Sequence, residues 1–236
     1  LWKVRYGLHM VANRAEERLL FEYQRELAAL FGYKDKDEKL AIEQFMQHYY
    51  RVVLSLRELN DVLLQFLDEA IINKSAPNSV APINARFQLR GNFIEVTHDK
   101  IFEETPSALL EIFVLVGYNE SIQGIRASTI RLIRESRNFI NDAYRENVQN
   151  KQLFLELLKS PYNLVTQLRR MKRYGILGRY LPEFDLIIGQ MQHDLFHIYT
   201  VDDHTLNLIE FLRRFLYPSS KITFPVISRL MHSIPE

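Results

Sequence analysis

Residues 40–72 read LAIEQFMQHYYRVVLSLRELNDVLLQFLDEAII, a run without glycine or proline. Its apolar side chains recur mostly three or four residues apart, the spacing that places them on one face of an α-helix. A helix of this length is typical of the spine of a helical bundle, so the stretch predicts a mainly α fold. The apolar positions are Ile42, Phe45, Tyr49, Val52, Val53, Leu56, Leu59, Leu63, Phe66 and Leu67.

Helical spacing continues on both sides of this run. On its N-terminal side, residues 1–11 have one apolar face, and Asn13 with Glu16 resembles a capping box that would start a second helix ending near Gly32. Helices are also predicted on its C-terminal side, where Pro182, Thr200 or Asp202, and Pro225 mark the starts of the last ones. The earlier ones cover residues 106–116, 128–144, 151–159 and 162–174.

Residues 84–98 depart from the helical pattern. Phe87 and Leu89 alternate with polar residues, and Ile94 and Val96 do the same. The dipeptide Gly91-Asn92 between them is typical of a two-residue hairpin turn. The sequence therefore predicts one small β-hairpin, which must pack on helices because two strands alone are marginally stable.

The composition limits the kinds of site this chain can contain. It has 236 residues, no cysteine and a formal net charge of +1. Any metal must therefore be held by His, Asp or Glu, and the charge gives no indication of a nucleic-acid partner. No apolar run approaches the roughly 18 residues of a membrane span, and no signal-peptide pattern is present. We expect a cytoplasmic protein without a membrane partner.

A polar stretch, GQMQHDLFHIYTVDDHT, occupies residues 189–205 between apolar helices. His193 and His197 are four residues apart, so they could share a helix face as in a zinc-protease motif. That motif requires Glu where Asp194 stands, and no third ligand is found in the right context. A zinc-protease site is therefore not favoured.

The same stretch closely resembles the entrance of the HD phosphohydrolase domain in the family of bacterial PII uridylyltransferase/uridylyl-removing enzymes. GILGRYLPEF at residues 175–184 resembles that family's lead-in, and residues 1–21 resemble the helices after its nucleotidyltransferase domain. Matches in between are individually weak but occur in the family's order. They are Tyr49-Tyr50-Arg51, Arg57-Glu58-Leu59-Asn60, Phe87-Gln88-Leu89-Arg90-Gly91 and Gly124-Ile125.

The resemblance implies a role for His204 as the first metal ligand of an HD domain, for Mg²⁺ or Mn²⁺. The family's His-Asp dyad follows that ligand by a few dozen residues, so the resemblance implies that the adjacent His193-Asp194 pair is not the dyad. A surface or packing role for His193 is therefore favoured. His197, Asp202 and Asp203 are candidates for orienting the metal ligand through hydrogen bonds, with a turn or helix cap as the alternative. We expect no metal bound to this chain alone.

Basic residues of the first two predicted helices are candidates for contact with nucleotide phosphates. Ion pairs with neighbouring glutamates are the favoured alternative. The candidates are Arg5, His9, Arg14 and Arg18, and the glutamates are Glu16, Glu17 and Glu22.

Two further basic clusters could meet phosphates or an acidic partner. A solvated, charge-balanced helix face is the favoured interpretation, because aromatic residues that would stack on bases are scarce between the cationic ones. One cluster comprises Arg126, Arg131, Arg134 and Arg137, and the other Arg169, Arg170, Lys172 and Arg173.

The predicted fold is thus an irregular helical bundle with one hairpin, leading into the first helices of an HD domain. We expect residues 1–165 to form a helical domain following a nucleotidyltransferase domain, and residues 166–236 to begin a truncated HD domain. By resemblance the parent enzyme transfers UMP from UTP to a tyrosine of the PII signalling protein and hydrolytically removes it, in nitrogen regulation, with glutamine sensed elsewhere. The chain would be an internal, inactive fragment. Alternatives are another nucleotidyltransferase–HD fusion, such as a tRNA nucleotidyltransferase, and a helical interaction module.

Overall fold

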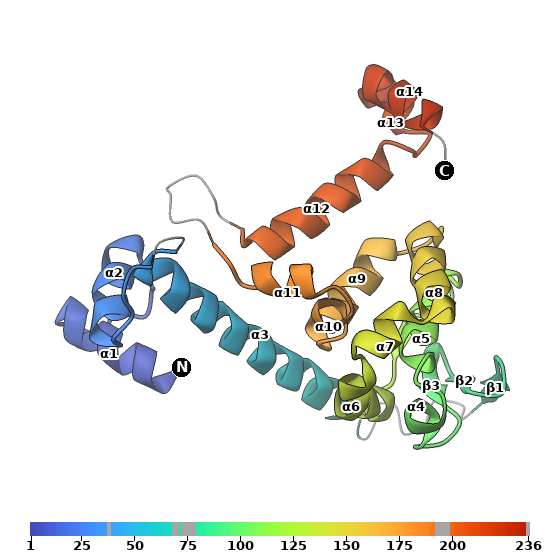
Figure 1. Cartoon of the computed structure of the whole chain (residues 1–236), viewed down its shortest axis with the longest axis horizontal. Helices are drawn as coiled ribbons and strands as arrows, with labels where there is room; N and C mark the ends of the chain where they lie inside the picture. Colours follow the sequence, from blue (N-terminus) through green and yellow to red (C-terminus); the bar gives the residue numbers. More distant parts are fainter. Residues whose placement is uncertain (37–38, 68–70, 72–78, 192–198, 235–236) are drawn as a thin grey trace.

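The computed structural model describes residues 1–36, 39–67, 71, 79–191 and 199–234. Most of the described chain is helical, which confirms the predicted mainly α fold. Two short helices, α1 (Trp2–Ala12) and α2 (Phe21–Leu30), lie at one end of a long helix, α3 (Ala41–Leu67). A larger group of helices and a small sheet lies at its other end (Figure 1).

The N-terminal helices pack on the start of α3 through a small apolar cluster that includes Leu8, Leu27, Ile42 and Phe45. The predicted capping box at Asn13 is wrong. Asn13 instead ends α1 in the left-handed conformation, with a φ of 49°, which asparagine tolerates better than most residues. The second helix begins only at Phe21.

The long helix predicted from residues 40–72 is confirmed over Ala41–Leu67. Its first turns are buried, but farther along Leu56, Leu59 and Leu63 are 45%, 49% and 55% exposed. The helix therefore connects two apolar clusters and is not buried along its whole length as a bundle spine would be.

The predicted hairpin is confirmed and belongs to a larger, four-stranded sheet in the order β1-β2-β3-β4. Strands β2 (Phe87–Arg90) and β3 (Phe93–Val96) are antiparallel, and Gly91 in their turn has a φ of 59°. Strand β1 (Val80–Pro82) pairs with β2, and β4 (Gly124–Ile125) runs parallel to β3. A strand of two residues is too short to show a period in the sequence, so β4 was not predictable from alternation.

The main core lies between this sheet and the helices that surround it. Helix α5 (Ala108–Gly117) is buried on most sides and contacts α8 (Val148–Lys159) and α9 (Leu164–Arg173). Helices α4 (Ile101–Glu104) and α6 (Ala127–Ser136) contact each other, and α6 also contacts β3 and α3. The far half of α3 is thus attached to this core through α6 and α9.

The single helix predicted over residues 128–144 is wrong, because this segment forms three pieces. Helix α6 passes into the 3₁₀ turn η3 (Arg137–Phe139), and α7 (Asp142–Glu146) starts afresh. The Asn141 side chain caps α7 by accepting a hydrogen bond from the Tyr144 N–H at 3.0 Å. An asparagine that satisfies free N–H groups in this way favours a helix start over helix continuation.

The C-terminal third consists of short helices around one longer one. Helix α10 (Leu177–Tyr180) contacts α9, and α11 (Pro182–Ile187) contacts α10. Helix α12 (Val201–Arg214) contacts α11 and leads to α13 (Ser220–Thr223) and α14 (Pro225–Ser233). Figure 1 shows α12 extending away from α11 toward this terminal pair. The predicted helix starts at Thr200, Pro182 and Pro225 are confirmed.

Helix α12 reaches the main core through Leu206, which is 1% exposed. Many of the apolar side chains beyond it are exposed. They include Leu208, Phe211, Leu212, Tyr217, Ile222, Val226 and Leu230. Among the described residues, no helix is both long and apolar enough to cross a membrane.

Candidate functional site

The candidate metal-proximal residues lie in the first turn of α12. Thr200 is the N-cap residue, and the Val201 N–H donates to the Gln190 carbonyl oxygen at 2.8 Å. The Thr200 hydroxyl donates to Asp203 Oδ2 at 3.3 Å. Acidic side chains are favourable in this turn because the helix dipole leaves partial positive charge at its N-terminus.

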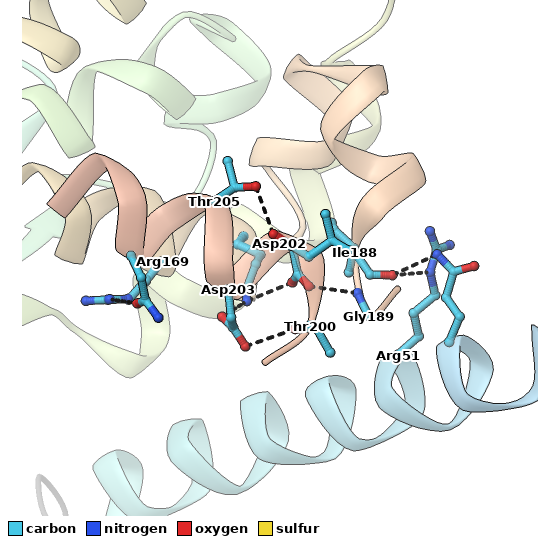
Figure 2. Close-up of polar contacts among 12 residues, drawn as sticks. Arg51, Arg169, Ile188, Gly189, Thr200, Asp202, Asp203 and Thr205 are labelled. Carbon is cyan, nitrogen blue, oxygen red and sulfur yellow. Dashed lines mark hydrogen bonds and ion pairs between the residues drawn. The ribbon is translucent and has the colours of Figure 1, made fainter. Parts of the chain in front are cut away.

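A buried lysine forms ion pairs with both aspartates of this turn. Lys172 Nζ, from α9, lies 2.9 Å from Asp202 Oδ2 and also contacts Asp203 Oδ1. The other Asp202 oxygen accepts the Gly189 N–H at 3.1 Å (Figure 2). Since the side chains of Lys172 and Asp202 are only 7% and 3% exposed, this ion pair lies within the protein interior and fixes α12 against α9.

These contacts determine how the turn could meet a metal. Every carboxylate oxygen of Asp202 and Asp203 already has a protein donor. His204 is exposed, and its backbone N–H donates to Thr200 O at 2.9 Å. No group of three or more His, Asp or Glu side chains in the described part of the chain could hold a metal ion. The described residues therefore do not make a complete metal site.

The end of α11 and the turn after it pack against α3. Arg51 Nε donates to the Ile188 carbonyl at 3.1 Å, and Gln47 Nε2 donates to the Leu186 carbonyl at 2.8 Å (Figure 2 shows the Arg51 contact). Gly189 has a φ of 70°, and a Cβ there would lie 3.2 Å from the Gln47 carbonyl oxygen. Residues far apart in the sequence thus hold the turn after α11 on α3, and hold the start of α12 on α9.

Sequence reasoning did not identify Lys172, Gln47 or Arg51 as supports of this turn. One signal for Lys172 was present, because it follows the buried Leu168 by four residues and so lies on the apolar face of α9. Gln47 and Arg51 bind backbone carbonyls, which no side-chain pattern in the sequence indicates.

The placement of the remaining residues of this stretch is not described. His193, Asp194 and His197 lie outside the described residues. Their predicted roles stay predictions, as does the metal-ligand role of His204.

At the N-terminal end, two of the candidate phosphate-binding residues share one glutamate. Arg5 Nη2 lies 2.6 Å from Glu17 Oε1, and His9 Nε2 lies 3.3 Å from the same oxygen. The hydrogen bond from Arg5 lowers the pKa of the Glu17 carboxyl from its usual value.

The other two candidates share the neighbouring glutamate. Arg14 and Arg18 lie 2.7 and 3.3 Å from Glu16, which also accepts the Arg18 backbone N–H at 3.0 Å. This backbone hydrogen bond is the main reason why the pKa of Glu16 is lowered. The four basic residues therefore have the ion pairs that the sequence favoured, and their contact with nucleotide remains a prediction.

Known protein families match most of the chain. Residues 1–64 match a family model described as GlnD PII-uridylyltransferase, which covers α1, α2 and most of α3. Residues 87–180 match the model of the uridylyltransferase GlnD third domain, which begins at β2 and ends with α10.

Curated relatives extend the similarity to the whole chain. It is 56% identical to the bifunctional uridylyltransferase/uridylyl-removing enzymes of Pseudomonas aeruginosa and Azotobacter vinelandii, and 55% identical to that of Ectopseudomonas mendocina. Each alignment covers 100% of this chain and 26% of the relative, so the chain spans about a quarter of the length of these enzymes. No solved structure matches.

Proposed function

The chain belongs to the GlnD uridylyltransferase family, and we propose that it is the helical region joining the uridylyl-transferring and uridylyl-removing parts of a bifunctional enzyme. The relatives' printed names include both activities, which supports this proposal over the tRNA nucleotidyltransferase alternative. The substrates of the whole protein would be UTP and the PII signalling protein, with glutamine as a regulatory ligand. We place this enzyme in the cytoplasm and propose no nucleic-acid or membrane partner.

The observation that supports the joining role best is the way the start of α12 is fixed. Helix α3 contributes Gln47 and Arg51 to the turn before α12, and α9 contributes Lys172 to its first turn. The segment that matches the uridylyltransferase model therefore binds the residues just before the HD-like stretch, and the Gly189 N–H connects that turn to Asp202 of α12. Contacts of α3 and α9 with the residues before and at the start of α12 would keep the two active sites at a fixed separation.

In the first turn of α12, His204 would be one ligand of a Mg²⁺ or Mn²⁺ ion in the uridylyl-removing site. Its imidazole is exposed, whereas the neighbouring aspartates are occupied by Lys172, Thr200 and Gly189. Asp202 and Asp203 would act by fixing the helix turn that presents the imidazole, and the other ligands would come from further parts of the enzyme. A bound metal polarises a phosphodiester and supplies hydroxide.

The test uses the full-length enzyme and compares two histidines. Because metal affinity depends on each ligand, His204→Ala is expected to abolish metal-dependent removal of UMP from PII and to leave UMP transfer largely unchanged. His98→Ala is the matched control, since His98 is also exposed and follows β3 far from α12. Normal removal by the His204 variant would exclude the proposed ligand role.

The chain by itself is proposed to have neither activity. A 236-residue preparation should transfer no UMP to PII and should release none from modified PII, because its described residues do not make a complete metal site. Clear activity of the isolated chain in either direction would contradict the proposal. A full-length enzyme that keeps both activities after deletion of this region would favour the interaction-module alternative.

A further inference from the structure

A cleft of about 480 Å³ lies where the far half of α3 meets α9 and the β3–β4 edge of the sheet. Its volume is within the usual range of small-molecule sites. It is separate from the first turn of α12, and residues of that turn do not line it. The side chains that matter for its chemistry are those of Arg57, Asp61, Phe93, Arg170 and Arg173.

Cations outnumber carboxylates in the lining of this cleft. Arg57, Arg170 and Arg173 contribute three guanidinium groups, and Asp61 is the one acidic residue among the lining residues. Asp61 is engaged, because Arg173 Nη1 lies 2.6 Å from its Oδ2. Two guanidinium charges are therefore left without a carboxylate in the cleft.

These two arginines are placed differently. Arg170 is held in position by neutral acceptors, since it donates to the Gln123 carbonyl at 2.7 Å and to Gln167 Oε1 at 3.3 Å. Burial lowers the pKa of its guanidinium from the usual value. Arg57 is exposed, and within the described part of the chain no ion pair is found for it.

The carboxylate of the residue next to Arg57 is engaged outside the cleft. Glu58 follows Arg57 on α3, but its Oε1 lies 2.7 Å from Arg134 Nε on α6. Burial raises the pKa of Glu58, and the charges of Arg134, Arg137 and Arg173 act in the opposite direction. The two basic clusters of the sequence thus meet along α3 with a local excess of positive charge.

We propose that this cleft binds a small molecule with two or more linked phosphates. A phosphate chain offers the densely charged oxygens that guanidinium groups bind through short, paired hydrogen bonds. Arg170 is fixed in advance, and Arg57 is free to close on the ligand from α3. Phe93 lies at the same wall, where its ring would contact an attached apolar or aromatic group. The proposal is independent of the function proposed for His204.

The test measures binding of pyrophosphate to the 236-residue chain by isothermal titration calorimetry at low salt. Wild-type protein is expected to bind one pyrophosphate in a salt-sensitive manner. Arg57→Gln should weaken binding by roughly ten- to a hundredfold, because it removes hydrogen bonds between charged partners. Arg25→Gln is the matched control, since Arg25 is an exposed arginine on α2 at the opposite end of α3.

A second variant is expected to raise the affinity for pyrophosphate, so this part of the test does not rely on loss of binding. Asp61→Asn removes the only carboxylate among the lining residues and releases Arg173, so it should tighten pyrophosphate binding by roughly three- to tenfold. Circular dichroism and thermal unfolding of each variant would establish that it is folded.

Nucleotides distinguish the sources of a phosphate chain. UTP and ATP that bind like pyrophosphate would support recognition of the phosphates alone. Tighter nucleotide binding that Phe93→Ala reduces to the pyrophosphate level would support an added ring contact. Absence of pyrophosphate and nucleotide binding, or binding that neither Arg57→Gln nor Asp61→Asn changes, would overturn the proposal.

Discussion

Replacing Lys172 with methionine tests whether the buried ion pair fixes α12. The substitution keeps an unbranched apolar chain in place of the lysine stem and removes the ammonium group that lies 2.9 Å from Asp202 Oδ2. Asp202 would keep the Gly189 N–H as a donor, but its carboxylate would be buried beside Asp203 without a countercharge. Breaking a buried pair from one side typically costs about 3–5 kcal/mol.

The loss in free energy of unfolding can be measured by urea unfolding and by thermal unfolding. A loss of this size in a domain of 150–250 residues lowers the melting temperature by about 6–20 °C. Lys151→Met is the matched control, because Lys151 pairs with Glu146 at 2.6 Å but the two side chains are 50% and 78% exposed. An exposed pair contributes only about 0–1 kcal/mol.

A double variant separates charge burial from packing. Adding Asp202→Asn to Lys172→Met removes the uncompensated carboxylate and is expected to recover much of the lost stability. Hydrogen exchange of α12 amides should become faster in the single variant than in the double one. If Lys172→Met costs no more than Lys151→Met, the inference that this pair fixes α12 is refuted.

Three further predictions concern the rest of the fold. Replacing Phe87, which is 0% exposed, with alanine should lower the free energy of unfolding by about 3–5 kcal/mol. Phe66→Ala, on the exposed face of α3, should change that free energy by about 0.5 kcal/mol or less. Gly189→Ala should lower the free energy of unfolding more than Gly32→Ala does, because both glycines have positive φ but only a Cβ at Gly189 meets neighbouring atoms. Equal losses would contradict the packing of Gly189 against α3. Because the pKa of Glu17 is lowered, its ion pair stabilises the protein above the ordinary pKa of 4.5, and this stabilisation is lost as the pH falls through the lowered value. Glu17→Gln should therefore make the free energy of unfolding depend less on pH on the acid side. An unchanged pH dependence would exclude this contribution.

Much of the fold was predictable from local patterns. The spacing of apolar residues indicated α3, alternation around Gly91-Asn92 indicated β2 and β3, and two prolines marked helix starts. The errors came from competing local choices. Asn13 can start a helix by capping or end one in the left-handed conformation, and the sequence alone did not decide between them.

The candidate site was less predictable, because its geometry depends on contacts between distant segments. Asp202 and Asp203 were recognised beside His204, but the lysine that pairs with them is 30 residues away from Asp202. The excess charge at the cleft is a similar case. Arg57 lies on α3 and Arg170 on α9. Only the packing of these two helices brings both cations to the lining of one cleft.

The metal-dependent rate of UMP removal, divided by the rate of UMP transfer in the same full-length preparation, tests the central claim most directly. If His204 is a metal ligand as proposed, its loss should lower the first rate and spare the second. We expect His204→Ala to lower this ratio by roughly a hundredfold or more, since even residues that only orient metal ligands cost 10–100-fold when replaced. A ratio equal to that of the His98→Ala control would contradict the claim that α12 presents His204 to the uridylyl-removing site.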